Sequence, residues 1–228
     1  MNENNVEIKN SESKNAETKI LIKCPEIDPK DLFMLSYIAL SQLDAEILKT
    51  VEKLKKGDLI VGELYFQISK REKMPMSLLL HGESNQLTVT CKYKEMNEAK
   101  SLICNIGNKI SRLAENFSKL NEESKEKLRE IFRVLKEIDR VIRSILSQKN
   151  VEELYFSLSL LRERACNSAK NLLDIPIKTG QWLNILNNLR LRKNHNARLN
   201  TETAKKLLLD LLYWKKRILQ EFKNVEEE

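Results

Sequence analysis

The amino-acid sequence predicts an all-α protein, an antiparallel helical bundle with one small β element near residues 87–93. Three observations carry this prediction. Glycine and proline are scarce, with 5 and 4 residues in a chain of 228. Lysine and glutamate are abundant, which suits long helices. From residue 95 onward, apolar residues recur three and four positions apart, the spacing of helices that bury one face.

Composition also limits the class of protein and its partners. The chain has 40 Lys and Arg residues against 33 Asp and Glu, a formal net charge of +7, which favours an anionic partner. No window approaches the ~20 apolar residues that span a bilayer, and the first 18 residues are too polar for a secretory leader. We therefore expect a cytoplasmic protein that has no membrane partner.

The cysteine pattern predicts buried thiols in a reducing compartment rather than a metal centre. None of the four cysteines forms a CxxC pair, so a zinc site is not expected. We expect neither a metal nor a cofactor. The cysteines are Cys24, Cys91, Cys104 and Cys166.

The N-terminal half divides into a tail and a small region. Residues 1–18 are polar and predict a disordered tail. In the region 19–94, the sequence predicts a helix from Asp31 to Lys56, broken near Ser41 and stopped by Gly57. Further helices are expected over 58–68 and 75–80. The alternating, β-branched run Leu87–Tyr93 predicts the strand.

This order of helices, basic turn and strand is similar to a winged helix-turn-helix. The resemblance implies that Lys70, Arg71 and Lys73 contact DNA beside a recognition helix over 74–80. A small α/β cap packed on the bundle is the alternative interpretation of the same residues.

The region 95–225 predicts the helical bundle itself. One apolar stripe runs through 102–117, and Asn121 caps a second helix that reaches Ile145. Asn150 caps a third helix, which ends before Pro176. A short helix follows Gly180. Either Asn200 or Thr201 caps the last helix, whose periodicity predicts burial of Leu208, Leu211 and Ile218.

A basic segment precedes that last helix and holds His195, one of only two histidines. His195 follows Arg190 by five positions, and Asn194 directly precedes it. Histidine moves protons near neutral pH, and arginine binds phosphate through a planar fork. Further cations surround this pair: Arg192, Lys193 and Arg198.

The Arg-x4-His spacing, between a short helix and a capped amphipathic helix, resembles the motif of HEPN domains over roughly residues 120–225. That family contains helical ribonucleases of defence and toxin–antitoxin systems. The resemblance implies that His195 acts as general acid or base and that Arg190 holds the scissile phosphate. Arg192, Lys193, Asn194 and Arg198 would bind the RNA. The family pairs its motifs across a two-fold axis, which implies a homodimer or a partner protein.

Two interpretations remain open at this point. The first is an RNA-binding protein or a metal-independent endoribonuclease, with RNA favoured over DNA. The second is a non-catalytic helical module in which His195 lies in a solvated cationic loop. Such a module would be a DNA-binding winged-helix regulator that dimerises through its long helices, or a subunit of a nucleoprotein assembly.

Overall fold

The computed structural model describes residues 6–11, 17–68, 75–92, 96–167, 174–192 and 197–227. The chain forms two compact units, Met1–Leu120 and Asn121–Glu228. The predicted all-α class is wrong, because the first unit is built on a six-stranded antiparallel sheet. The protein is therefore mixed α/β, and only the second unit is wholly helical in its described part.

The sheet of the first unit has the strand order β1-β2-β6-β5-β4-β3, and every neighbouring pair is antiparallel. A short 3-10 helix, Gly82–Ser84, connects β5 to β6. The strands are β1 Val6–Ser11, β2 Glu17–Lys23, β3 Glu46–Lys55, β4 Asp58–Gln67, β5 Pro75–His81 and β6 Gln86–Lys92.

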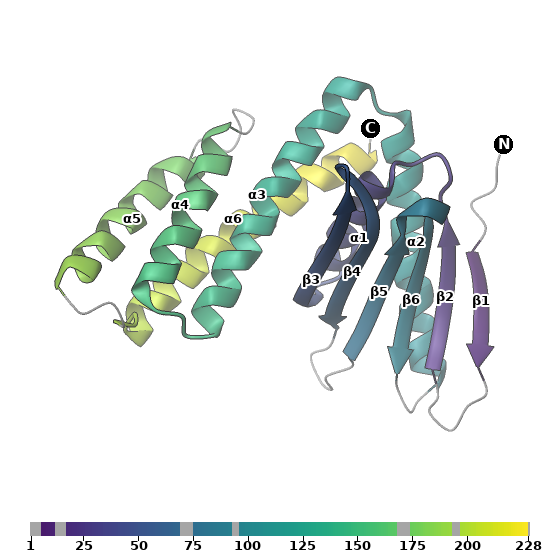
Figure 1. Ribbon diagram of the computed structural model, residues 1–228, viewed down its shortest axis with the longest axis horizontal. Coiled ribbons are helices and arrows are strands. Elements are labelled where there is room, and N and C mark those ends of the chain that lie inside the picture. The colour runs from purple at the N-terminus through teal and green to yellow at the C-terminus, as the bar shows by residue number, and fades with distance from the viewer. Residues whose placement is uncertain are drawn as a thin grey trace. The chain divides into compact units, whose positions relative to one another are not determined.

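Two helices cover one face of this sheet, α1 (Pro29–Gln42) and α2 (Met96–Lys119) (Figure 1). Two glycines permit the close approach. A Cβ atom on Gly62 would lie 2.5 Å from the Phe33 ring of α1. A Cβ on Gly107 of α2 would lie 2.9 Å from Ile20 of β2. Each helix therefore packs closely on the sheet at a position where one of the two contacting residues is a glycine.

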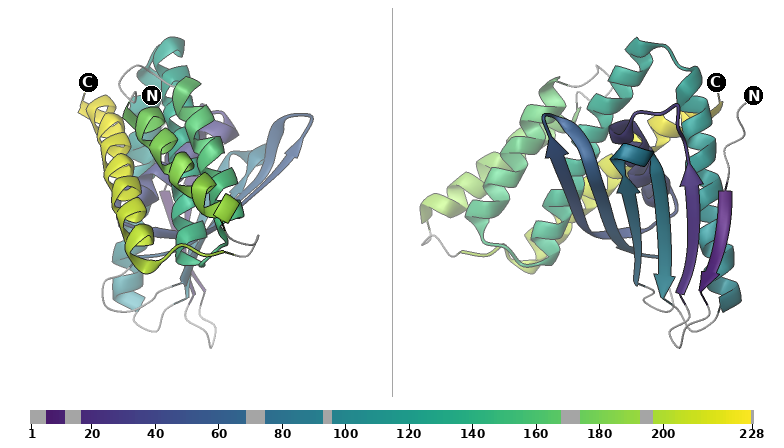
Figure 2. Two further views of the ribbon diagram at one scale, coloured as in Figure 1. Left: turned by 90° about the vertical axis from the view of Figure 1, so that its left-hand side faces the viewer. Right: turned by 45° about the vertical axis from the view of Figure 1, so that its right-hand side comes forward.

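Strands replace the helices expected over 46–56, 58–68 and 75–80. Residues Lys56 and Gly57 have φ values of 53° and 93°, so they form a two-residue hairpin turn between β3 and β4. The register between these strands shifts twice, which bends and twists the hairpin. Figure 2 shows the β3–β4 hairpin curving away from the other strands.

The expected region boundaries also differ from the observed ones. We expected a tail over 1–18, but Val6–Ser11 pairs with β2 as an edge strand. We expected the helical bundle to begin at residue 95, but α2 packs on β2 and β6 and belongs to the first unit. The boundary between the two units therefore falls after Leu120 in the sequence, because α2 packs its apolar stripe on the sheet of the first unit.

The described part of the second unit is a bundle of four helices, as the apolar periodicity predicts. α3 (Glu122–Leu146) packs against α4 (Val151–Asn167) and α6 (Thr201–Glu227), and α4 packs against α5 (Asp174–Arg192). Of the three α6 residues expected to be buried, Leu211 and Ile218 are fully buried and Leu208 is half-buried. Trp182 of α5 donates its indole N–H to Asp210 of α6 at 2.9 Å, which joins the outer helices.

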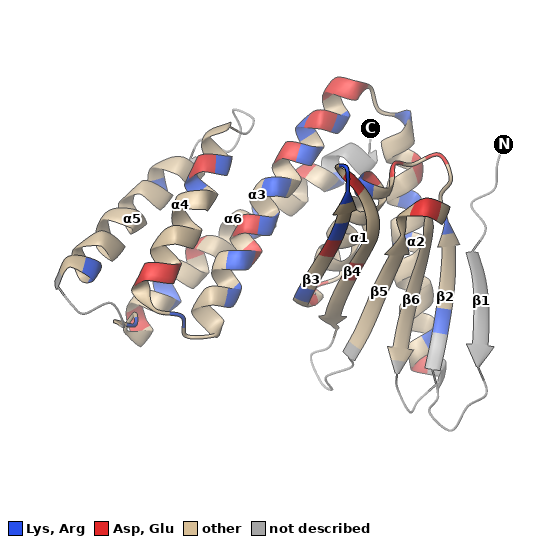
Figure 3. Ribbon diagram, viewed as in Figure 1, with Lys and Arg blue, Asp and Glu red and all other residues tan. Residues whose placement is uncertain are grey.

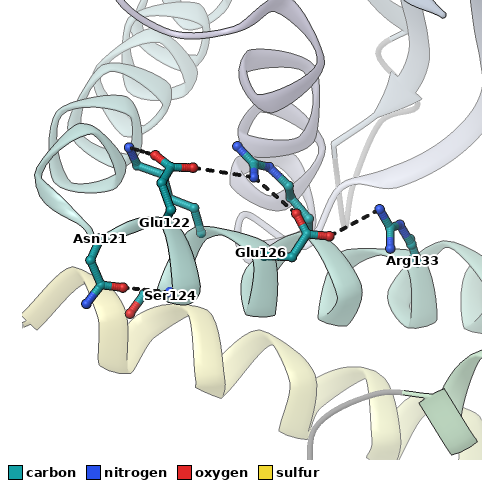
Figure 4. Close-up of polar contacts among 7 residues, drawn as sticks. Asn121, Glu122, Ser124, Glu126 and Arg133 are labelled. Carbon is teal, nitrogen blue, oxygen red and sulfur yellow. Dashed lines mark hydrogen bonds and ion pairs between the residues drawn. The ribbon is translucent and has the colours of Figure 1, made fainter.

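Asparagine caps begin three of these helices. The caps at Asn121 and Asn150 were predicted, and Asn200 was one of the two residues expected to cap the last helix. The side-chain oxygens of Asn121, Asn150 and Asn200 accept backbone N–H groups at 2.8, 2.9 and 2.8 Å. Figure 4 shows the first cap beside the ion pairs that link Glu122 and Glu126 to basic residues of the same helix. Figure 3 shows these opposite charges alternating along α3.

One helix start differs from its prediction. α5 begins at Asp174, ahead of Gly180, so Pro176 lies in its first turn. Proline is compatible with that position, because the first N–H groups of a helix have no partner within the helix. The apparent break before Gly180 is therefore the beginning of the helix.

Candidate nucleic-acid-binding site

Arg190 lies in the last turn of α5, against the first turns of α4. The guanidinium carbon of Arg190 is 4.6 Å from the ring centroid of Tyr155. Its Nη1 atom is 3.6 Å from Oε1 of Glu152. The Arg190 side chain is 34% exposed, so it is held on one side by protein and reached by solvent on the other.

The local structure explains why these three side chains meet. α4 and α5 pack together, and the Arg190 contacts bring the end of α5 to the beginning of α4. Glu152 lies in the first turn of α4, where a carboxylate interacts favourably with the helix dipole. Arg190 lies at the C-terminal end of α5, where a cation is similarly favoured.

The chain returns to the same end of α4 after the basic segment. The carbonyl of Ala197 accepts the N–H of Val151 at 2.8 Å. Arg198 donates from Nη1 to Oε1 of Gln148 at 3.3 Å, and Gln148 has a left-handed φ of 52°. Arg190 and Arg198 are therefore both anchored at the N-terminal end of α4.

Most of the predicted site residues lie outside the described part of the chain. These include the proposed general acid–base His195 and the cations predicted for DNA contact. Arg192 is described only as the last residue of α5. Outside the described residues are Lys193, Asn194, His195, Lys70, Arg71 and Lys73.

Sequence reasoning missed three residues of the site: Gln148, Glu152 and Tyr155. Each belongs to the beginning of α4 or to the turn before it, so only the antiparallel packing of α4 and α5 brings them to Arg190. The predicted cap at Asn150 was the available signal, because it fixes where α4 begins. A helix that starts there and packs antiparallel to α5 must present its first turns to the end of α5.

The arrangement is suited to binding an anion. Tyr155 contacts one face of the guanidinium, and this contact leaves the N–H edges oriented in the plane of the group. The Glu152 carboxylate accepts from part of that edge, so a phosphate must share or displace it. Because Arg198 lies near the same helix end, two cations are available to neighbouring phosphates of one strand.

Nowhere in the described ranges do three or more His, Cys, Asp or Glu side chains gather as a metal site would require. None of the helices that the structure describes is both long and apolar enough to cross a membrane.

Comparisons with protein-family models, curated proteins and solved structures find no match for this chain.

Proposed function

We propose that the second unit binds RNA and cleaves it without a metal ion, with His195 transferring protons and Arg190 binding the scissile phosphate. One observation carries this proposal. Tyr155 and Glu152 fix the Arg190 guanidinium at the end of α4 to which the chain returns at Ala197, two positions after His195. A phosphate-binding group is thus held near the start of the segment that carries the proton-transfer group.

In this mechanism His195 takes the proton of an RNA 2′-hydroxyl, or supplies one to the leaving 5′-oxygen. The 2′-oxygen attacks the adjacent phosphorus, the bond to the 5′-oxygen breaks, and a 2′,3′-cyclic phosphate forms. Arg190 stabilises the negative charge that develops on the phosphate. Arg192, Lys193, Asn194 and Arg198 bind flanking phosphates. One histidine and one arginine per chain favour completion of the site by a second copy or a partner protein.

The experiment that tests this proposal compares a labelled RNA with DNA of the same sequence, both in the presence of EDTA. The mechanism requires a 2′-hydroxyl, so we expect cleavage of RNA alone and products that end in a 2′,3′-cyclic phosphate. Cleavage of the DNA, or loss of RNA cleavage on chelation, would contradict the proposed chemistry.

A matched pair of variants separates the role of Arg190 from a general loss of packing. Arg217 of α6 also lies over a tyrosine, with its guanidinium carbon 5.8 Å from the ring centroid of Tyr213. We expect Arg190→Ala to weaken RNA binding and turnover, and Arg217→Ala to leave both unchanged. Equal effects of the two substitutions would show that Arg190 acts only through stability.

The second candidate is a non-catalytic RNA-binding subunit of a nucleoprotein assembly. The Arg190–Glu152 ion pair favours it, because this contact also serves to fasten α5 to α4. Salt-dependent RNA binding without cleavage would identify this function. We do not propose the winged-helix regulator, since β4 and β5 are strands where that fold requires helices.

A further inference from the structure

The face of the sheet opposite α1 and α2 forms a second candidate surface, on which lysines flank a central area of mostly uncharged side chains. Residues alternate along each strand, so those that follow Ile20, Leu64, Leu78 and Val89 by one position point away from the helices. No helix of the first unit covers this face among the described residues, as Figure 1 shows. We call it the open face.

Strand register arranges the open face in three rows that cross five strands, from β2 to β3. The first row consists of Lys19, Thr90, Ser77, Tyr65 and Lys49. The second row consists of Leu21, Thr88, Leu79, Glu63 and Val51. The third row consists of Lys23, Gln86, His81, Val61 and Lys53.

Lysines therefore stand at both ends of the first and third rows. The β2 pair is Lys19 and Lys23, and the β3 pair is Lys49 and Lys53. The two pairs are four strand spacings apart, about 19 Å at ~4.8 Å per spacing. The floor between them carries hydroxyl and amide groups beside the apolar Leu79 and Val61 and the imidazole of His81. Glu63 is the one carboxylate in the three rows. The charge of this surface is thus complementary to an anion that crosses the strands.

Tyr65 supplies an aromatic surface on the same floor. Its side chain is 40% exposed, and the Lys49 Nζ atom lies 5.6 Å from the ring centroid. The hydroxyl donates to Glu63 Oε2 at 2.9 Å, which raises the pKa of Tyr65 and fixes the ring. A base that stacks on this ring would have the Lys49 ammonium beside its phosphate.

We propose that the open face binds single-stranded RNA, with the backbone held by the four lysines and one base stacked on Tyr65. This surface belongs to the first unit, whereas the Arg190 site belongs to the second. The proposal rests on the proposed function and adds to the cleavage site a domain that holds the substrate. A shallow sheet face suits single strands, whose unstacked bases lie flat on it, better than duplex RNA. The hydroxyls of Ser77, Thr88 and Thr90 are available to the sugars and base edges.

Charge reversal tests the lysines in the full chain, with a fluorescent single-stranded RNA as probe. We expect Lys23→Glu combined with Lys53→Glu to reduce affinity about tenfold or more, and to lower the slope of log affinity against log salt by about two. The control is Lys30→Glu combined with Arg112→Glu, which makes the same charge change on the exposed surfaces of α1 and α2. Equal losses in the two double variants, or no RNA binding by the wild type, would overturn the proposal.

Substitution of Tyr65 tests the stacking separately from charge. We expect Tyr65→Ala to reduce affinity about fivefold or more, while Tyr65→Phe retains the ring and most of the affinity. The same losses should appear in an Arg190→Ala background, since the two surfaces act independently. Unchanged binding by Tyr65→Ala, or preference for duplex RNA or an acidic peptide over the single strand, would exclude the proposed role. Matching thermal unfolding curves confirm that each variant is folded.

Discussion

The guanidinium of Arg190 lies over the ring of Tyr155, 4.6 Å from its centroid, and so joins the end of α5 to the beginning of α4. This contact both holds α5 against α4 and orients the Arg190 side chain. A cation held over an aromatic ring at an exposed site gains about 0.5–1 kcal/mol. The energy is modest, but it restricts a long side chain to one orientation before a phosphate arrives.

The first prediction therefore concerns Tyr155. We expect Tyr155→Ala to weaken RNA binding by about 0.5–1 kcal/mol, because Arg190 loses the ring that orients it. Tyr155→Phe keeps the ring and should bind like the wild type. Fluorescence anisotropy at constant salt measures both variants. Identical affinities for Tyr155→Ala and the wild type would show that Arg190 does not depend on this contact.

A second prediction tests the core of the bundle. Leu211 of α6 is fully buried, so Leu211→Ala should lower the free energy of unfolding by about 2–5 kcal/mol. Leu209 on the same helix is 67% exposed and provides the control, with a change within about 0.5 kcal/mol for Leu209→Ala. Urea denaturation measures both. Similar losses for the two leucines would contradict the assignment of the buried face.

A third prediction addresses the ion pair between α3 and α6. The Lys215 ammonium lies 2.7 Å from Oδ1 of Asp139, whose side chain is only 6% exposed. Lys215→Met should destabilise the second unit by about 1–3 kcal/mol, because a buried carboxylate loses a charged donor 2.7 Å away. Lys215→Met combined with Asp139→Asn should recover part of that loss. Additive effects of the two substitutions would show that the pair is not coupled.

A fourth prediction follows from the cysteines. Burial raises the pKa of the Cys24 thiol to about 11 and also raises the pKa of Cys91, whereas Cys166 is exposed. At neutral pH both buried thiols are protonated, and only the thiolate attacks a disulfide reagent. We expect rapid labelling of Cys166, and labelling of Cys24 and Cys91 only on unfolding. Mass spectrometry of the labelled Cys166→Ser variant shows which of the remaining thiols have reacted. Rapid labelling of Cys24 in this variant would contradict the burial of its side chain.

The helices of the second unit could be predicted because each buries one face. α3 and α6 repeat their apolar residues every three or four positions, and asparagine caps mark where α3, α4 and α6 begin. The expectation of buried cysteines holds for Cys24 and Cys91, and Cys104 is half-buried. It is wrong for Cys166, which lies in the last turn of α4 and faces solvent.

The sheet could not be predicted in the same way. In β3, Ile47, Leu48, Val51 and Leu54 match the period of a helix, yet only Ile47 is buried because β3 is an edge strand in a projecting hairpin. In β5, the run Leu78-Leu79-Leu80 has no period at all. The lysines of the open face escaped notice because pairing across five strands, rather than sequence proximity, brings them to one surface.

The candidate site could be predicted only in part from the sequence, for a related reason. Arg190 was identified from its spacing to His195, but Tyr155 and Glu152 reach it through the packing of α4 against α5. Such contacts depend on the distance of each residue from the ends of two helices. An error of a few residues at one end, as occurred at the beginning of α5, is enough to hide them.

The measurement that tests the central claim most directly is the RNA cleavage rate of wild type and His195→Ala in EDTA. The proposed mechanism predicts metal-independent cleavage by the wild type and a rate at least about 100-fold lower without the imidazole. His195→Asn, which keeps a polar side chain of similar shape, should be equally slow. Equal cleavage by wild type and His195→Ala would contradict the assignment of His195, and cleavage by neither would contradict ribonuclease activity itself.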